Sequence, residues 1–174
     1  MEINYNSEWF ESGYYVYVLI IEHHKKGRYY YVGMTGDRNH ISARSPFYRM
    51  MGHFNTYNLN NSSHDSQLVA GLRDKKLIDI PQGKENIRVC VERAITNKII
   101  EVRAKFNKIR DFDPENHKVN RIYLESVELN LIKIFEDNEL EIFNKDTEIT
   151  DYQKNNKEAL IKAKEIFNNL NIKK

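Results

Sequence analysis

Residues 14–33 decide the fold that this sequence predicts, and they read YYVYVLIIEHHKKGRYYYVG. Residues 14–21 and 29–33 are rich in β-branched and aromatic side chains, which are favoured in β-strands. Residues 22–28 between them are polar and contain Gly27, a residue type suited to turns. This pattern predicts a β-hairpin whose loop is somewhat longer than the tightest type.

Two tyrosines of this hairpin are candidate functional residues. Successive side chains of a strand point to opposite faces, so alternate residues share a face. With a turn centred near Lys25, Tyr17 and Tyr31 lie close together on one face of the hairpin. Two interpretations remain open from the pattern alone: the hydroxyl groups serve a functional site, or the rings only pack a half-buried sheet.

After the hairpin, Ser45-Pro46 predicts the start of a helix. Serine caps free amide groups at a helix start, and proline is tolerated in the first turn. Arg49 and His53 are four residues apart and are therefore neighbours on one face of this helix. The apolar residues at helical spacing, which should pack against the sheet, are Phe47, Met50, Met51 and Phe54.

Capping and periodicity signals predict further elements along the chain. They are a short helix from Ser63 or Asp65 to about Lys76, a third strand at 87–95, a basic helix at 98–110 and a final helix at 152–170. Asp113-Pro114 marks the end of the basic helix, because proline cannot continue one.

The strongest helix signal covers residues 119–136, and it contains a carboxylate inside an apolar stripe. The stripe includes Leu124, Val127, Leu131, Ile134 and Phe135, with Ile132 beside it. Glu128 stands within it and would lose its hydration unless something compensates. A metal ion or a paired cation would compensate; the alternative is a glutamate at the edge of the stripe that reaches water. Glu125 differs, since it can pair with Arg121 four residues earlier and should point toward the flank.

Composition limits the class of protein. With 174 residues and 40% hydrophobic side chains, the chain can bury one core, which predicts a single domain. Its apolar runs are far shorter than the roughly 20 residues of a membrane span, and the N-terminus does not resemble a secretion signal, so a cytoplasmic protein without a membrane partner is expected. One cysteine, Cys90, allows neither a disulfide framework nor a cysteine-built zinc site.

The distribution of charge says more than its sum. A net charge of +2 does not by itself predict a nucleic-acid partner. Basic residues gather at 23–28, 38–49, 73–76 and 98–110. These clusters would favour nucleic-acid binding if the fold brings them to one side of the molecule.

Six short features occur in a definite order along the chain. They are Tyr15-Val16-Tyr17, Tyr31-Val32-Gly33 followed by Thr35, Arg49, His53, Glu128 and Phe143-Asn144. In this order they resemble the GIY-YIG nuclease family, over about residues 14–144. The chain departs from the family in the first tripeptide, which lacks its leading glycine, and in the enlarged segment 55–120. The stretch between Gly33 and Arg49 is also longer than usual, so Arg38 or Arg44 is an alternative to Arg49 as the functional arginine.

The resemblance implies a fold. It implies an α+β protein with a small three-stranded antiparallel sheet flanked by helices. A single domain would comprise a catalytic part at 1–145, including the enlarged segment, and a C-terminal helix within 146–174 that packs on the same domain.

The resemblance also implies a function, a metal-dependent endonuclease that hydrolyses phosphodiester bonds in nucleic acid, with DNA as the expected substrate. Glu128 would hold Mg²⁺ or Mn²⁺, and Arg49 would brace the phosphate. Tyr17 would act as the base or assist it, His53 would relay the proton, Tyr31 would position water or phosphate, and Asn144 would support the architecture. The expected nucleic-acid contacts are Arg38, Arg44, Lys98, Arg103 and Lys105.

Other functions remain alternatives to this one. A nucleic-acid-binding module on the same fold could have lost catalysis, although every expected catalytic side chain is present. A metal-free hydrolase or phosphotransfer enzyme for small molecules lacks support, because the sequence has no glycine-rich phosphate loop. Among nucleases, a restriction-type, repair, mobile-element or defence role is open, and complete cutting of both strands would favour a two-fold symmetric homodimer.

Overall fold

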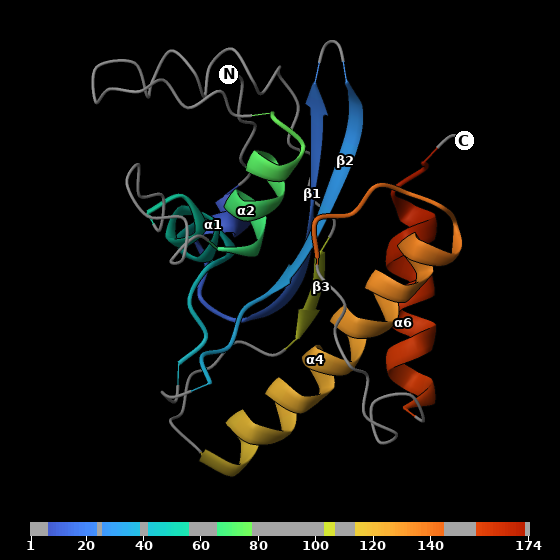
Figure 1. Cartoon of the computed structure of the whole chain (residues 1–174). Helices are drawn as coiled ribbons and strands as arrows, with labels where there is room; N and C mark the ends of the chain where they lie inside the picture. Colours follow the sequence, from blue (N-terminus) through green and yellow to red (C-terminus); the bar gives the residue numbers. More distant parts are fainter. Residues whose placement is uncertain are drawn as a thin grey trace.

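The structure, a computed structural model, describes residues 7–23, 26–38, 42–55, 66–77, 103–106, 114–144 and 156–172. In chain order the elements are η1 (Ser7–Phe10), β1 (Tyr14–His23), β2 (Gly27–Met34), α1 (Pro46–Asn55), α2 (Gln67–Asp74), β3 (Arg103–Phe106), α4 (Pro114–Asp137) and α6 (Lys157–Asn169) (Figure 1). The α+β class expected from the sequence is confirmed. Among the helices described, none is long and apolar enough to cross a membrane.

A long antiparallel hairpin of β1 and β2 is the centre of the fold. The pairing runs from Val16 opposite Met34 to His23 opposite Gly27, which places the turn where the sequence predicted it. β3 pairs antiparallel with the other edge of β1, so the strand order is β2-β1-β3. Gly27 has a φ of 92° at the turn, a conformation that glycine adopts without strain.

The basic helix predicted at 98–110 is wrong over the residues that the structure describes. Residues 103–106 are the strand β3, with Tyr14 of β1 opposite Phe106. Helical spacing of apolar residues indicates a helix only weakly. As a strand, β3 forms hydrogen bonds with the backbone groups at the otherwise unpaired edge of β1, and this outweighs the helical pattern. The strand predicted at 87–95 lies outside the described residues. Pro114, expected to end a helix, begins α4, where its missing N–H costs nothing.

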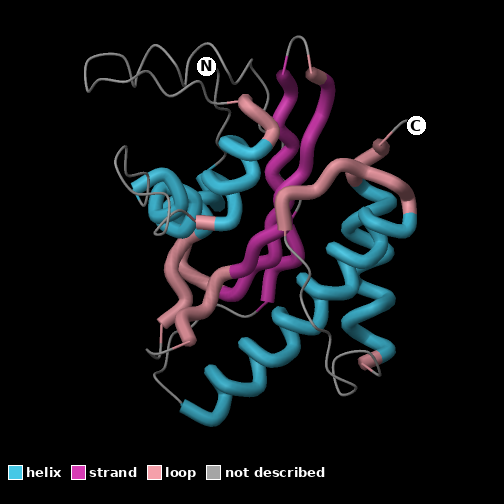
Figure 2. The backbone as a smooth tube through the Cα atoms, in the orientation of Figure 1, coloured by secondary structure: helices cyan, strands magenta, loops and turns pink. Residues whose placement is uncertain are grey.

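Helices cover both faces of the sheet (Figure 2). On one face α4 and α6 pack against Val16, Val18 and Val32 in a continuous core. On the other face α1, α2 and η1 pack against a second cluster that contains Tyr17 and Tyr31. The two tyrosines therefore share one face, as the hairpin pattern predicted.

The helix α1 begins where Ser45 predicted it, since the backbone N–H of Tyr48 donates to Ser45 Oγ at 3.2 Å. Met50 is fully buried and Phe47 packs beside it. Met51 was expected to pack too, but it is 38% exposed, because its position faces away from the sheet. The side chain of Phe54 lies outside the described residues.

The later helices occur where they were predicted, but they begin or end at different residues. α2 begins after the cap Ser66, whose side chain accepts from Val69 N, whereas Ser63 and Asp65 lie outside the described residues. α4 is longer than predicted at its N-terminal end. α6 begins after the cap Asn156 and buries three side chains in the core that α4 and the sheet share, namely Ala159, Ala163 and Ile166.

Gly33 is required because the ring of Tyr17 lies directly over it. The two residues are paired across the hairpin, and a Cβ on Gly33 would come within 2.5 Å of Cζ and Oη of Tyr17. We expect Gly33→Ala to destabilise the fold by about 1–3 kcal/mol, the cost of overpacking a closed core. Urea unfolding measures this, with Gly52→Ala as the matched control, since a Cβ on Gly52 meets nothing within 4 Å. Equal stability of Gly33→Ala and wild type would contradict the packing.

Candidate active site

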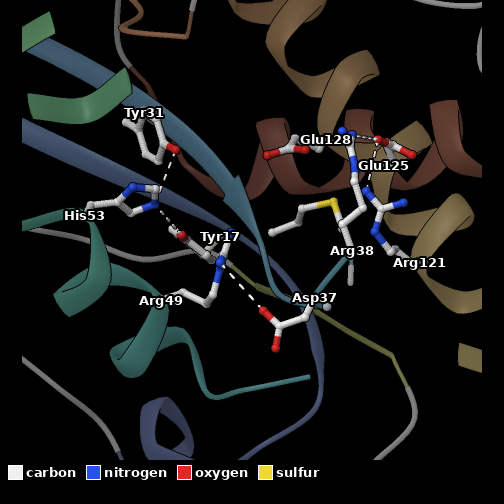
Figure 3. A pocket seen from close by; sticks show the side chains of 11 residues that line it. Tyr17, Tyr31, Asp37, Arg38, Arg49, His53, Arg121, Glu125 and Glu128 are labelled. Atoms are coloured by element: carbon white, nitrogen blue, oxygen red, sulfur yellow. Dashed lines mark hydrogen bonds and ion pairs between the residues drawn. The ribbon is translucent and has the colours of Figure 1, made fainter. Parts of the chain in front are cut away.

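A cavity of about 420 Å³ opens where α1, the end of β2 and α4 meet (Figure 3). Five of the six predicted catalytic residues line it, from β1, β2, α1 and α4: Tyr17, Tyr31, Arg49, His53 and Glu128. The same wall includes Asp37, Arg38, Arg121 and Glu125. The fold thus brings together side chains that are far apart in the sequence.

His53 joins the two tyrosines. Its Nε2 lies 3.2 Å from Tyr17 Oη and 3.3 Å from Tyr31 Oη. With the ring proton on Nδ1, the lone pair of Nε2 can accept from either hydroxyl group. The position of His53 one turn after Arg49 on α1 therefore directs the imidazole toward the hairpin face predicted to carry the site.

The electrostatics of this trio favour a neutral imidazole and protonated Tyr31. Burial, and next the nearby positive charge of Arg49, lower the pKa of His53 to about 4. Burial raises the pKa of Tyr31 well above its usual value, with further contributions from Tyr17 and Glu128. At neutral pH His53 is uncharged and can accept a hydrogen bond, whereas Tyr31 can donate one and is unsuited to act as a base.

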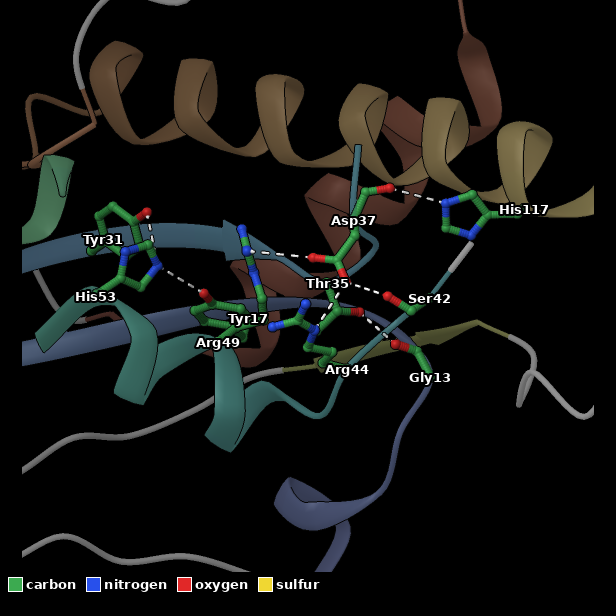
Figure 4. Close-up of polar contacts among 10 residues, drawn as sticks. All are labelled: Gly13, Tyr17, Tyr31, Thr35, Asp37, Ser42, Arg44, Arg49, His53 and His117. Atoms are coloured by element: carbon green, nitrogen blue, oxygen red, sulfur yellow. Dashed lines mark hydrogen bonds and ion pairs between the residues drawn. The ribbon is translucent and has the colours of Figure 1, made fainter. Parts of the chain in front are cut away.

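Asp37 binds two residues of the loop after β2 and lies near the guanidinium of Arg49 (Figure 4). Its carboxylate oxygens lie 3.8 Å from Nη1 of Arg49 and 3.1 Å from Nε of Arg44, and it also accepts from the hydroxyl of Ser42. Its backbone carbonyl accepts from Nε2 of His117 on α4 at 3.0 Å. One residue therefore links α1, the loop and α4 around the cavity.

Glu128 is a carboxylate without a partner. It makes no hydrogen bond or ion pair with any residue that the structure describes, although it borders a cavity with three arginines. Burial, and next the charge of Glu125, raise the pKa of Glu128 to about 8, while Arg49 and Arg121 oppose this shift. The sequence left open that a paired cation compensates Glu128, but no residue that the structure describes forms an ion pair with it.

This unpaired carboxylate fits a divalent cation. Mg²⁺ prefers carboxylate oxygens and keeps several waters, so one or two protein ligands suffice. Within the described ranges no group of three His, Cys, Asp or Glu side chains could hold a metal ion. A cation at Glu128 would therefore take its other ligands from water and from the substrate.

Glu125 is paired, but it does not point away from the site. Its Oε1 accepts from Nη2 of Arg121 at 3.3 Å, the pair that the helical spacing predicted. The same oxygen lies 3.4 Å from Nη2 of Arg38. The expectation that Glu125 faces the flank is wrong, because this double contact keeps it on the cavity wall.

Asn144 lies outside the cavity and supports it. Its Oδ1 accepts from the N–H of Val32 and its Nδ2 donates to the carbonyl of Val32, both at 2.8 Å. Both bonds join the segment that follows α4 to β2, next to the β-bridge between Tyr30 and Ile142. The architectural role that the resemblance implies for Asn144 stays a prediction.

The predicted nucleic-acid contacts are only partly placed. Arg38 lines the cavity, whereas Arg44 lies beside it, bound to Asp37 and stacked over the ring of Tyr48 at 4.6 Å. Lys98 lies outside the described residues. Arg103 and Lys105 belong to β3, for which the structure describes the backbone alone.

Besides Glu125, which was expected to face the flank, two polar residues of the cavity wall were not predicted from the sequence. Asp37 follows Gly36, which has a φ of 104°, directly after the end of β2. A polar residue at such a turn is a recognisable signal, because loops that follow strands often carry functional groups. Arg121 was considered as a helix partner of Glu125, and no local pattern indicated that it borders a cavity.

The raised pKa of Glu128 predicts how the stability of the metal-free protein depends on pH. Unfolding returns the carboxyl group to its usual pKa of 4.5, so between pH 4.5 and about 8 the folded chain binds more protons there. Stability is therefore lost as the pH rises through this window. A pKa difference of one between the folded and unfolded states corresponds to about 1.4 kcal/mol, so the loss reaches a few kcal/mol above pH 8.

Glu128→Gln should lack this loss, because an amide carries no charge at any pH. We expect the variant to match wild type near pH 4 and to be more stable at pH 8–9, measured by urea unfolding in chelator. Mg²⁺ at pH 8 should stabilise wild type and leave the variant unchanged. The control is Glu136→Gln on the exposed side of α4. A difference between Glu128→Gln and wild type that stays constant with pH would contradict the assignment.

Comparisons of the chain with protein-family models, with curated proteins and with solved structures find no match in any of the three.

Proposed function

We propose that the protein is a metal-dependent endonuclease of the GIY-YIG kind that hydrolyses phosphodiester bonds, with DNA as the substrate. One observation supports the proposal: five side chains to which the resemblance assigns distinct roles in phosphodiester hydrolysis line one polar cavity. We also infer that the β2-β1-β3 sheet and its helices form one GIY-YIG-like domain, with an enlarged segment at 55–120 and α6 packed on it.

Arg49 and Glu128 would bind the scissile phosphate and the metal. Nη1 of Arg49 lies 3.8 Å from Oδ1 of Asp37, which is a weak contact. The guanidinium can therefore turn to form bidentate hydrogen bonds with phosphate oxygens. Glu128 would hold Mg²⁺, which supplies charge neutralisation at the scissile phosphate. The unpaired carboxylate and the arginine border the same cavity, as this division of roles requires.

Tyr17 and His53 would handle the proton of the attacking water. His53 is neutral at pH 7 and lies within hydrogen-bond distance of the Tyr17 hydroxyl. Arg49 contributes to the low pKa of His53, so a phosphate bound to Arg49 would offset that charge and make His53 a stronger base. Tyr31, protonated, would donate a hydrogen bond to water or to a phosphate oxygen.

The test is cleavage of supercoiled plasmid and of a structured RNA during a titration of Mg²⁺, Mn²⁺ and chelator. We expect metal-dependent cutting of DNA, abolished by chelator. Binding without cutting at any metal concentration would favour the non-catalytic nucleic-acid-binding module. Hydrolysis of small phosphodiesters with no activity on either polymer would favour the small-molecule enzyme.

The same assay bears on oligomeric state. A single site of this kind cuts one strand in each encounter, so rapid linearisation at a palindromic site would favour a symmetric dimer. The inner face of α6 is covered by its own core, which leaves its outer face, with Ile161 66% exposed, as the candidate contact. Mass in solution and the ratio of nicked to linear plasmid, compared between wild type and Ile161→Glu, measure this directly.

A further inference from the structure

We propose that Arg38 and Arg121 form a second phosphate-binding site beside the catalytic centre, and that Glu125 occupies this site as a resident anion until nucleic acid displaces it. The ligand is a backbone phosphate that neighbours the scissile one. This inference rests on the proposed function and specifies how the same cavity recognises a polymer.

The geometry is that of two guanidinium groups converging on one oxygen. Oε1 of Glu125 lies 3.3 Å from Nη2 of Arg121 and 3.4 Å from Nη2 of Arg38 (Figure 3). Arg121 comes from α4, whereas Arg38 comes from the loop after β2. Helical spacing explains the first contact but not the second, which joins residues 87 positions apart. A single carboxylate thus holds two cations from separate elements at the mouth of a cavity.

The contacts are weak enough to be exchanged. Charge-assisted N–H···O bonds have lengths of about 2.7–2.9 Å, and both contacts of Glu125 are longer. The Arg38 side chain is 76% exposed, and exposed ion pairs contribute little to stability. Nε of Arg121 is buried and finds no hydrogen-bond partner among the described residues, so this guanidinium is not saturated. By contrast, the shorter Arg44–Asp37 pair at 3.1 Å involves a carboxylate with two further polar contacts.

A phosphate suits this pair of arginines better than the carboxylate does. Its oxygens can accept two-pronged bonds from both guanidinium groups, whereas the two arginines share one oxygen of Glu125. With Glu125 turned aside, two positive groups would face the cavity with no anion between them. Nucleic acid offers a row of phosphates, so one can occupy this site while another is at Arg49.

The position of the second site relative to the first supports this use. Glu125 is one turn before Glu128 on α4, and both border the cavity that Arg49 enters from α1. Three arginines and three carboxylates line that cavity: Arg38, Arg49, Arg121, Asp37, Glu125 and Glu128. Of the carboxylates, Asp37 and Glu125 lie against these arginines and offset part of their positive charge. The cavity therefore becomes a stronger anion site when Glu125 turns aside.

The experiment measures binding of a labelled DNA duplex by fluorescence anisotropy in chelator, where no cleavage occurs, across a range of salt. Glu125→Gln should bind about three- to fivefold more tightly, because the resident anion no longer competes. Arg38→Gln and Arg121→Gln should bind more weakly and should each reduce the salt slope by about 1. The Arg38 side chain is exposed, so this variant keeps the test valid even where Arg121→Gln folds poorly.

Matched controls separate the site from net charge. Glu136→Gln removes one negative charge from the same helix, and Arg28→Gln removes an exposed arginine at the far end of the hairpin. Both should alter affinity less than the site variants do. In the double variant Glu125→Gln/Arg38→Gln, the gain from Glu125→Gln should shrink, since the two residues act on one phosphate.

The outcomes distinguish this inference from the proposed function. Equal effects of Glu125→Gln and Glu136→Gln, in a protein that binds DNA and cuts it when Mg²⁺ is added, would overturn the second site alone. Polyglutamate competing as well as DNA would show a general anion site and would also overturn it. Absence of both binding and cutting for DNA and RNA by wild type would overturn the proposed function and this inference together.

Discussion

Glu128→Gln should abolish divalent-metal-dependent cleavage while the fold stays intact. The amide keeps the shape of the side chain but removes the charge that would hold the ion. Because Glu128 has no other partner among the described residues, its loss breaks no contact that stabilises the fold. We expect a fall in cleavage rate of at least ~100–1,000-fold, the scale for removing a preorganised charge from a reaction centre. Plasmid cleavage measures the loss of activity, and circular dichroism checks that the fold stays intact.

Glu125→Gln is the matched variant, since it makes the same substitution one turn earlier on the same cavity wall. Its carboxylate is already engaged by Arg38 and Arg121, so we expect a much milder effect on cleavage. If the order of the two effects were reversed, Glu125 would be the metal ligand. The assignment along α4 would then be wrong by one turn.

The elements that could be predicted from the sequence are those whose pattern is local. The hairpin followed from two runs of β-branched and aromatic residues on either side of a polar turn, and its register placed Tyr17 and Tyr31 on one face. α4 followed from an apolar stripe of helical period, and Glu128 was found because it interrupts that stripe. The hairpin is buried on both faces and α4 along one stripe, and in each case the apolar residues of the segment itself record that burial.

The predictions that were wrong or missing concern features that depend on contacts between residues far apart in the sequence. β3 has four residues, too few for a reliable pattern, and its state is set by the free edge of β1 rather than by its own propensity. Asp37 acts through Arg49 and through His117, which is 80 positions away. Arg38 meets Glu125 across a similar separation. Since no local period encodes such contacts, sequence reasoning named candidates for the base, the proton relay and the metal ligand, but not the residues that contact them from distant parts of the chain.

Arg49→Ala should lower the cleavage rate at least ~100-fold, the scale for losing a donor aimed at developing charge. The structure favours Arg49 over the two alternatives raised by the long loop. Arg44 does not line the cavity, and Arg38 is engaged at its mouth by Glu125. Only Arg49 among these three lies one turn from His53 on α1.

Measurements of single-turnover cleavage and of binding at several salt concentrations distinguish the roles of the three arginines. Arg38→Ala and Arg44→Ala should weaken binding in a salt-dependent manner and leave the rate of the bound complex nearly unchanged. Arg49→Ala should reduce that rate, and it should also raise the pKa of His53, because Arg49 contributes to keeping it low. An NMR titration of the His53 ring measures this second effect without any substrate. Near-normal turnover by Arg49→Ala, with a large loss in Arg38→Ala or Arg44→Ala, would move the phosphate-bracing role into the loop after β2.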